Sequence, residues 1–155
     1  MSRPRLLCID DDTGVRELYR VLFESYGYEV VLATDGKHAL QLFRSQKFDG
    51  VVVDYEMPGL NGSEVATLLK HESPATPVVM VSGCQSIVED APRFVDAAIA
   101  KGSAVGTLVD KVGTLLCSHV PPAPPKTTPI SRYLPLGSAL ATVALVGFFA
   151  PRLWR

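Results

Sequence analysis

The fold is decided by the stretch VVVDYEMPGLNG, residues 51–62. Three consecutive β-branched valines lie between Gly50 and Asp54, which is typical of a short strand buried on both faces. A turn segment, residues 57–62, comes next, and apolar residues at helical spacing begin again at Val65. The stretch therefore predicts a buried strand that ends in a carboxylate, then a turn, then a helix.

The same alternation extends in both directions from this stretch. Short apolar runs predict four more strands, at residues 6–9, 28–33, 77–81 and 97–100. Apolar positions at i, i+3 and i+4 spacing predict helices between the strands, most clearly over residues 15–26 and 105–116. Five strands that alternate with helices predict an α/β fold, in which helices cover both faces of a parallel sheet.

Polar residues indicate where the first helices begin, and a proline limits a later one. Asp12 or Thr13 can cap the first helix, and Thr34 is expected to cap the second. Pro92 permits only a short helix or irregular chain over residues 84–96.

Length and composition exclude several classes of protein. With 155 residues, the chain is long enough for one ordinary domain plus appendages. All 16 acidic residues and 11 of the 15 basic ones fall in residues 1–119, so this part carries a net charge of −5, which argues against nucleic acid as a partner. The three cysteines are odd in number and widely spaced, so neither a disulfide framework nor a zinc cluster is expected. The first apolar run, Leu6 to Ile9, is too short for a signal peptide.

Polar side chains follow four of the predicted strands. Asp10, Asp11 and Asp12 follow the first strand, Asp54 the third, Ser82 the fourth and Lys101 the fifth. The carboxyl ends of parallel strands meet at one edge of a sheet, where ligands gather. Carboxylates that meet there repel one another unless a cation joins them, and Mg²⁺ is a hard ion that suits a few carboxylates and water. A carboxylate can then attack phosphorus, while the metal and an ammonium neutralise the phosphoryl oxygens.

The order of these residues resembles the receiver domain of two-component response regulators, over residues 4–119. Four pieces of sequence carry the resemblance: LLCIDDD at 6–12, VVVDYEMPGLNG at 51–62, PVVMVS at 77–82, and Lys101. It implies a flavodoxin-like, doubly wound, five-stranded parallel sheet with strand order 2-1-3-4-5. It also implies a phosphoryl donor, either a histidine kinase or a phosphotransfer protein.

The resemblance implies a role for each of the polar residues. Three act on the phosphoryl group: Asp54 as its acceptor, Ser82 as the switch hydroxyl and Lys101 as the ammonium that binds phosphate. Mg²⁺ is expected to be held by Asp10, Asp11, Asp54 and the backbone carbonyl of Glu56. A protein of this kind catalyses its own phosphorylation and dephosphorylation, so it is expected to be a phosphoacceptor and not a turnover enzyme.

Three features depart from the family pattern. Gly102 follows the lysine where family members usually have proline, so the cis peptide common at that point is not expected. Ala98 stands where an aromatic ring often rotates inward on activation, so output is expected to run through the Ser82 loop or elsewhere. The segment from Ser82 to Lys101 is short and contains Pro92, so a reduced fourth helix is expected.

The last 36 residues have a different composition. Residues 120–132 form a proline-rich linker, which favours extended conformations and acts as a semi-rigid spacer. No charge occurs in the 19 residues from Tyr133 to Pro151, and a helix of that length spans ~28 Å, close to the hydrocarbon thickness of a bilayer. Residues 133–153 are therefore predicted to be a single-pass C-terminal transmembrane helix, with a buried core helix as the alternative. Mg²⁺ and the donor are cytoplasmic, so the receiver domain is expected to face the cytoplasm.

Three functions compete at this point. The leading interpretation is a membrane-tethered single-domain response regulator in a phosphorelay, whose output is contact with an unknown protein. The second is a pseudo-receiver, a membrane-bound interaction module that is not phosphorylated, although the complete set of site residues argues against it. The third is a haloacid-dehalogenase-like phosphatase, since residues 10–12 contain the Asp-x-Asp spacing of that class. Its threonine is one position early, however, the chain has no cap domain, and no later acidic pair stands at the end of a predicted strand.

Overall fold

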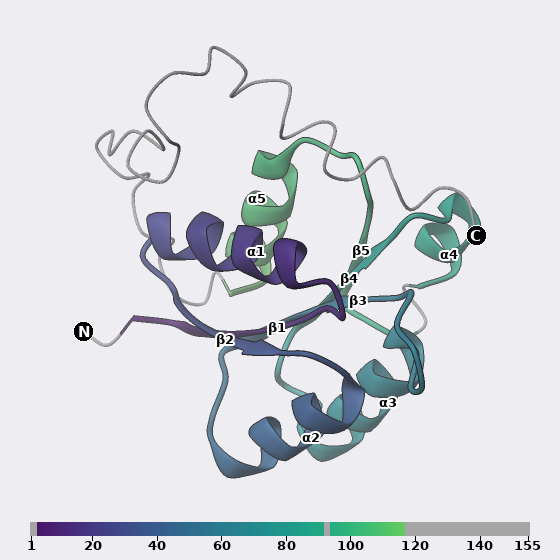
Figure 1. The fold of residues 1–155 in the computed structure, drawn as a ribbon, viewed down its shortest axis with the longest axis horizontal. Helices are drawn as coiled ribbons and strands as arrows, with labels where there is room; N and C mark the ends of the chain where they lie inside the picture. Colours follow the sequence, from purple (N-terminus) through teal and green to yellow (C-terminus); the bar gives the residue numbers. More distant parts are fainter. Residues whose placement is uncertain (1–2, 92–93, 117–155) are drawn as a thin grey trace.

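The computed structural model describes residues 3–91 and 94–116. These residues form a five-stranded parallel sheet in the order β2-β1-β3-β4-β5, flanked by helices (Figure 1). The strands are β1 (Arg5–Ile9), β2 (Glu29–Ala33), β3 (Gly50–Asp54), β4 (Val78–Ser82) and β5 (Ala97–Ala100). The helices are α1 (Thr13–Ser25), α2 (Gly36–Ser45), α3 (Gly62–Glu72), α4 (Gln85–Asp90) and α5 (Val105–Leu116).

The helices lie in two layers, one on each face of the sheet. Figure 1 shows α1 and α5 together on one face, and α2 and α3 on the other. Ala91, which follows α4, is buried in the same core as residues of α2 and α3. The predicted flavodoxin-like architecture with strand order 2-1-3-4-5 is therefore confirmed.

An apolar core fills the space between the sheet and each helical layer. Leu7 and Ile9 of β1 pack in the core beneath α2 and α3, whereas Leu6 and Cys8 pack in the core beneath α1 and α5. Successive residues of a strand point to opposite faces, so a strand covered on both faces must be apolar throughout. All five residues of β3 are buried, as the valine run predicted, and its one charged residue, Asp54, stands at its carboxyl end.

The first two helices begin on aspartates. Asp12 caps α1, and its Oδ1 accepts a hydrogen bond from the Val15 N–H at 3.1 Å. The prediction that Thr34 caps α2 is wrong, because Asp35 is the N-cap and accepts from the His38 N–H at 2.9 Å. The Thr34 hydroxyl instead donates to the Asp35 carboxylate at 3.0 Å. Two neighbouring residues were able to cap this helix, and the backbone brings the second within reach of the third helical N–H.

The chain between β4 and α5 follows the expected departures from the family pattern. α4 is a single short helix of six residues, Gln85–Asp90. Gly102 has φ +92°, a left-handed conformation that the proline ring forbids. No peptide bond among the described residues is cis. The glycine therefore sets a different path for the loop after Lys101 than a proline would.

Within residues 3–91 and 94–116, no helix combines the length and the apolar character needed to cross a bilayer. The predicted linker, residues 120–132, and the predicted transmembrane helix, residues 133–153, lie outside the described residues, as does the end of the predicted receiver domain.

Candidate functional site

The predicted site residues gather at the carboxyl edge of the sheet. Asp10 directly follows β1, Asp54 and Ser82 end β3 and β4, and Lys101 directly follows β5. Because all the strands are parallel, these ends lie along one edge. Asp10 and Asp54 are fully buried and Ser82 is 1% exposed, which is unusual for polar groups and needs specific partners.

The acidic residues form a compact cluster. Asp10, Asp11 and Asp54 each offer a carboxylate oxygen, and these oxygens all lie within 4.8 Å of one another. The loop that carries Asp10 and Asp11 is held by Arg16, whose guanidinium donates to the backbone carbonyls of both aspartates at 2.8 and 2.9 Å. An all-oxygen donor set with three negative charges suits a hard divalent cation such as Mg²⁺. The predicted carboxylate ligands are therefore brought together.

Within this cluster, the Asp54 carboxylate lies beside those of the other two aspartates and against the Lys101 ammonium. Lys101 Nζ contacts Asp54 Oδ1 at 2.6 Å, and only 7% of the lysine side chain is exposed. Burial, followed by the negative charge of Asp10, raises the pKa of Asp54 to about 7, and Lys101 opposes this shift. Burial alone would lower the pKa of Lys101, but its bonds to Asp54 and Glu56 outweigh burial and raise that pKa. The ammonium is therefore firmly charged beside the carboxylate.

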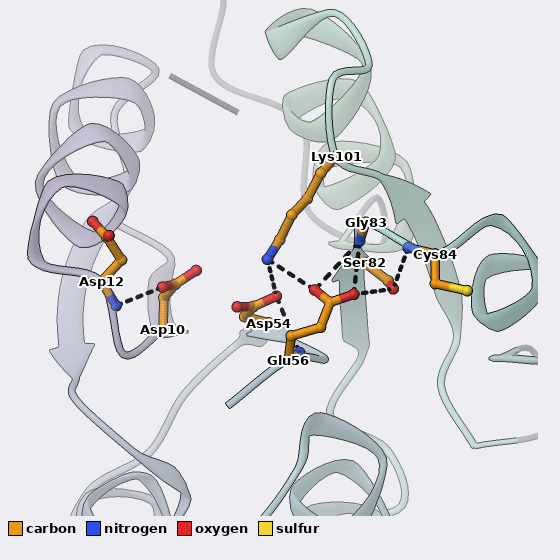
Figure 2. A network of polar contacts seen from close by, with 8 residues as sticks. All are labelled: Asp10, Asp12, Asp54, Glu56, Ser82, Gly83, Cys84 and Lys101. Atoms are coloured by element: carbon orange, nitrogen blue, oxygen red, sulfur yellow. Dashed lines mark hydrogen bonds and ion pairs between the residues drawn. The ribbon is translucent and has the colours of Figure 1, made fainter. Parts of the chain in front are cut away.

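The Glu56 side chain joins Lys101 to Ser82, as Figure 2 shows. Its carboxylate accepts from Lys101 Nζ at 2.9 Å, from Ser82 Oγ at 3.0 Å and from the Gly83 N–H at 3.0 Å. The Ser82 hydroxyl in turn accepts from the Cys84 N–H at 3.0 Å, which fixes its direction. Burial alone would raise the pKa of Glu56, but its bonds to Lys101, Ser82 and Gly83 lower it.

The start of α3 is wedged against the backbone that carries Asp54. The Gly62 N–H donates to the Tyr55 carbonyl at 3.0 Å. A Cβ atom at position 62 would lie 2.3 Å from the Asp54 carbonyl oxygen and 2.7 Å from the Tyr55 Cα. Asn61 caps the helix in a capping box with Glu64, so this first turn is held firmly in place. Because Gly62 has no side chain, the first turn of α3 can pack directly against the Asp54 and Tyr55 backbone and hold the end of β3 in place.

All six residues predicted from the sequence lie in one region, at the carboxyl edge of the sheet. The Asp54 side chain contacts the Lys101 side chain directly, while the Ser82 hydroxyl is joined to the Lys101 ammonium through the Glu56 carboxylate. The Lys101 backbone N–H also donates to the Ser82 carbonyl at 2.7 Å. The sequence predicted a role for the Glu56 backbone carbonyl alone, so its side chain and the Gly83 N–H were missed. The available signal was position, since Glu56 stands two residues beyond Asp54 in a loop at the same edge.

The sheet order and the buried carboxylates beside a lysine define a flavodoxin-like α/β domain with a polar site suited to a divalent cation. The family profile described as response regulator receiver domain matches residues 6–111. The chain therefore belongs to the family of response regulator receiver domains, and it carries the receiver domain of a two-component response regulator.

Relatives of known name support this membership. The response regulator MprA of Mycolicibacterium vanbaalenii is 40% identical over 85 residues, which cover 55% of this chain and 37% of MprA. The CAI-1 autoinducer sensor kinase/phosphatase CqsS of Vibrio cholerae is 38% identical over 85 residues, covering 53% of this chain and 12% of CqsS. The match thus spans little more than a third of the first relative and a small part of the second.

Solved structures share the fold. The response regulator TrrA of Thermotoga maritima, crystallised in complex with Mg²⁺ and BeF, has a TM-score of 0.69 and 30% identity, covering 72% of this chain and 98% of TrrA. A CheY-like receiver domain protein of Methanospirillum hungatei has a TM-score of 0.70 and 27% identity, covering 76% of this chain and 96% of that protein. Both matches extend over nearly the whole of the compared receiver domains.

Proposed function

We propose that this protein accepts a phosphoryl group on Asp54 from a histidine kinase or phosphotransfer protein and signals through protein contacts. The observation that carries the proposal is the placement of Asp54, whose buried carboxylate lies beside those of Asp10 and Asp11 and against the Lys101 ammonium. No structural reason explains burying two carboxylates, Asp10 and Asp54, beside a third, since each would be more stable in water. A site for phosphoryl transfer accounts for the acidic cluster and the lysine at once.

In the proposed reaction, an Asp54 carboxylate oxygen attacks the phosphorus of a phosphohistidine. The new O–P bond forms as the N–P bond breaks, and the electron pair stays on the donor imidazole. Lys101 lies 2.6 Å from the attacking carboxylate, where its charge can offset the negative oxygens of the incoming group. The Ser82 hydroxyl, at the end of the neighbouring strand, is placed to donate to one of those oxygens once it leaves Glu56.

The acidic cluster fits a resident Mg²⁺. We assign Asp10, Asp11, Asp54 and the Glu56 backbone carbonyl as its protein ligands. When bound, Mg²⁺ would neutralise charge on the phosphoryl oxygens and on the clustered carboxylates. TrrA was crystallised with Mg²⁺ and BeF, and beryllium fluorides imitate phosphoryl groups, which supports the same use of this site. Because the phosphoryl group stays on the protein, we do not regard the chain as a turnover enzyme.

Phosphorylation by a small-molecule donor is expected to depend on Mg²⁺. The full chain incubated with acetyl phosphate and Mg²⁺ should gain one phosphoryl group, and an excess of EDTA should reduce the rate by at least ~100-fold, since the carboxylates would then repel the donor. Intact-mass spectrometry or a phosphate-affinity gel measures the product. Absence of any phosphoprotein in the presence of Mg²⁺ would favour the unphosphorylated pseudo-receiver instead.

We further propose that residues 133–153 anchor the protein in a membrane, with the receiver domain in the cytoplasm. The support is compositional, namely an uncharged stretch of 19 residues after a proline-rich linker. The full chain is therefore expected in the membrane fraction of cells, and a version ending at His119 in the soluble fraction. Carbonate extraction followed by immunoblotting measures both, and recovery of the full chain in the soluble fraction would contradict the anchor.

A further inference from the structure

The Glu56 carboxylate collects three hydrogen-bond donors that come from different parts of the chain. The donors are the hydroxyl of Ser82, the last residue of β4, the N–H of Gly83, the first residue of the loop to α4, and the ammonium of Lys101, which follows β5. Their distances to the carboxylate oxygens are 3.0, 3.0 and 2.9 Å. Figure 2 shows all three pointing at the same side chain, beside Asp54. A surface ion pair would need only the lysine, so this is an organised anion site.

These donors are the groups that a phosphoryl group on Asp54 requires. Lys101 Nζ bridges the two carboxylates, at 2.6 Å from Asp54 and 2.9 Å from Glu56. The Glu56 carboxylate therefore lies next to the acceptor, within reach of the same ammonium and the same hydroxyl. The Ser82 hydroxyl and the Gly83 N–H each have a single hydrogen to donate, so a phosphoryl oxygen on Asp54 and a Glu56 oxygen compete for them, and the two anions repel each other.

We infer that the Glu56 side chain is an internal competitor, an anion that occupies the phosphoryl-oxygen subsite until phosphorylation displaces it. The inference rests on the proposed function, since it assumes that Asp54 is the acceptor. Glu56 and the phosphoryl group exclude each other, so each must weaken the binding of the other by the same factor. The glutamate side chain is 40% exposed, which gives the displaced carboxylate an open path into water.

Displacement has a direct consequence for the switch. In the unphosphorylated protein, Ser82 and Lys101 already bind an anion, and they stay drawn toward the site by Glu56. Phosphorylation therefore exchanges one anion for another at these two residues, and the Glu56 side chain is the group that is released. The position of the Glu56 side chain then reports phosphorylation. This agrees with the absence of an aromatic ring at Ala98, which leaves β5 without a side chain to rotate.

Binding of beryllium fluoride in saturating Mg²⁺ tests the competition. Three variants separate charge, reach and background: Glu56→Gln keeps the shape but removes the charge, Glu56→Asp keeps the charge but shortens the reach, and Glu24→Gln removes an exposed charge at the far end of α1. We expect Glu56→Gln and Glu56→Asp to bind beryllium fluoride roughly 5- to 20-fold more tightly than the wild type by calorimetry. Glu24→Gln should match the wild type. Unchanged or weaker binding by both Glu56 variants would overturn the inference.

A second measurement needs neither metal nor phosphoryl mimic. In metal-free protein, the backbone amide resonance of Gly83 should move in both Glu56 variants, because its N–H loses the carboxylate at 3.0 Å, and it should not move in Glu24→Gln. A Gly83 resonance that stays in place in both Glu56 variants would show that the contact is not formed in solution. The results distinguish the two proposals. If the wild type binds no beryllium fluoride, the proposed phosphoacceptor function is wrong. If the wild type binds it and the Glu56 variants bind it no more tightly, only the proposed competition by Glu56 is wrong.

Discussion

The Asp54→Asn variant is expected to take up no phosphoryl group. Without Mg²⁺, at pH 8, its free energy of unfolding is expected to exceed that of the wild type. The first effect follows because an amide oxygen is too weak a nucleophile to form the acyl phosphate. The second follows because burial and the charge of Asp10 disfavour an ionised carboxylate at this position. A single substitution should therefore abolish function and increase stability, as is common where a site stores unfavourable charge.

The pH dependence of the stability difference has a definite sign. The pKa of Asp54 is about 7 in the folded protein and 3.8 in the unfolded chain, so at intermediate pH the folded state holds a proton that the unfolded state has lost. Below pH ~4 the Asp54 carboxyl is protonated in both states and ionisation costs no stability. As the pH rises from ~4 to ~7 the free energy of unfolding falls, and above pH ~7 this loss is constant. Asp54→Asn should show no gain near pH 4 and a gain of about 1–3 kcal/mol at pH 8, less than the pKa shift alone implies because the Lys101 contact is lost too.

Urea unfolding in EDTA at pH 4 and pH 8, on wild type and variant in parallel, measures this gain. Comparing the two proteins at each pH cancels the other titrating groups. The substitution Asp49→Asn is a matched control, since Asp49 is an exposed carboxylate whose neighbour is the N–H of Arg5, at the opposite edge of the sheet. A variant that is less stable than the wild type at pH 8 would show that the Lys101 contact, and not burial, dominates at Asp54.

The strands could be predicted because their physical cause is local, whereas their order was implied by the resemblance to receiver domains. A strand covered on both faces must be apolar at consecutive positions, and residues 51–53 and 78–81 are. The strand ends then place Asp10, Asp54, Ser82 and Lys101 at one edge without further information. Features that depend on an apolar run or a repeating spacing in the sequence are therefore found in the structure.

The missed features depend on where a side chain points, which no run or period expresses. Thr34 and Asp35 both suit a helix cap, and the backbone geometry decides for Asp35. The resemblance to receiver domains implied a role for the Glu56 backbone carbonyl alone and none for its side chain. Its carboxylate turns inward because Ser82, Gly83 and Lys101, distant in sequence, each direct a donor at the same point. Convergence of this kind appears only once the chain is folded.

Substitution of Gly62 by alanine is expected to have the largest effect on stability, a loss of about 3 kcal/mol or more. The added Cβ would lie 2.3 Å from the Asp54 carbonyl oxygen, 2.7 Å from the Tyr55 Cα and 3.0 Å from the Asp54 carbonyl carbon. All three neighbours are backbone atoms, so no side-chain rotation can relieve the overlap. Either α3 withdraws from β3 or the end of β3 moves, and the second response displaces Asp54 from Lys101.

Gly106→Ala is the matched control for this prediction. Gly106 lies in α5, has no heavy atom within 4 Å of an added Cβ, and is not among the glycines with positive φ. Its replacement should be neutral or stabilising by up to ~1 kcal/mol, because alanine favours the helix. Urea unfolding gives both stabilities, and Mg²⁺-dependent labelling with acetyl phosphate at a temperature where Gly62→Ala remains folded reports the position of Asp54. If Gly62→Ala were as stable as Gly106→Ala, the close approach of α3 to the phosphoacceptor strand would be wrong, and with it the explanation of how the sheet holds Asp54 in place.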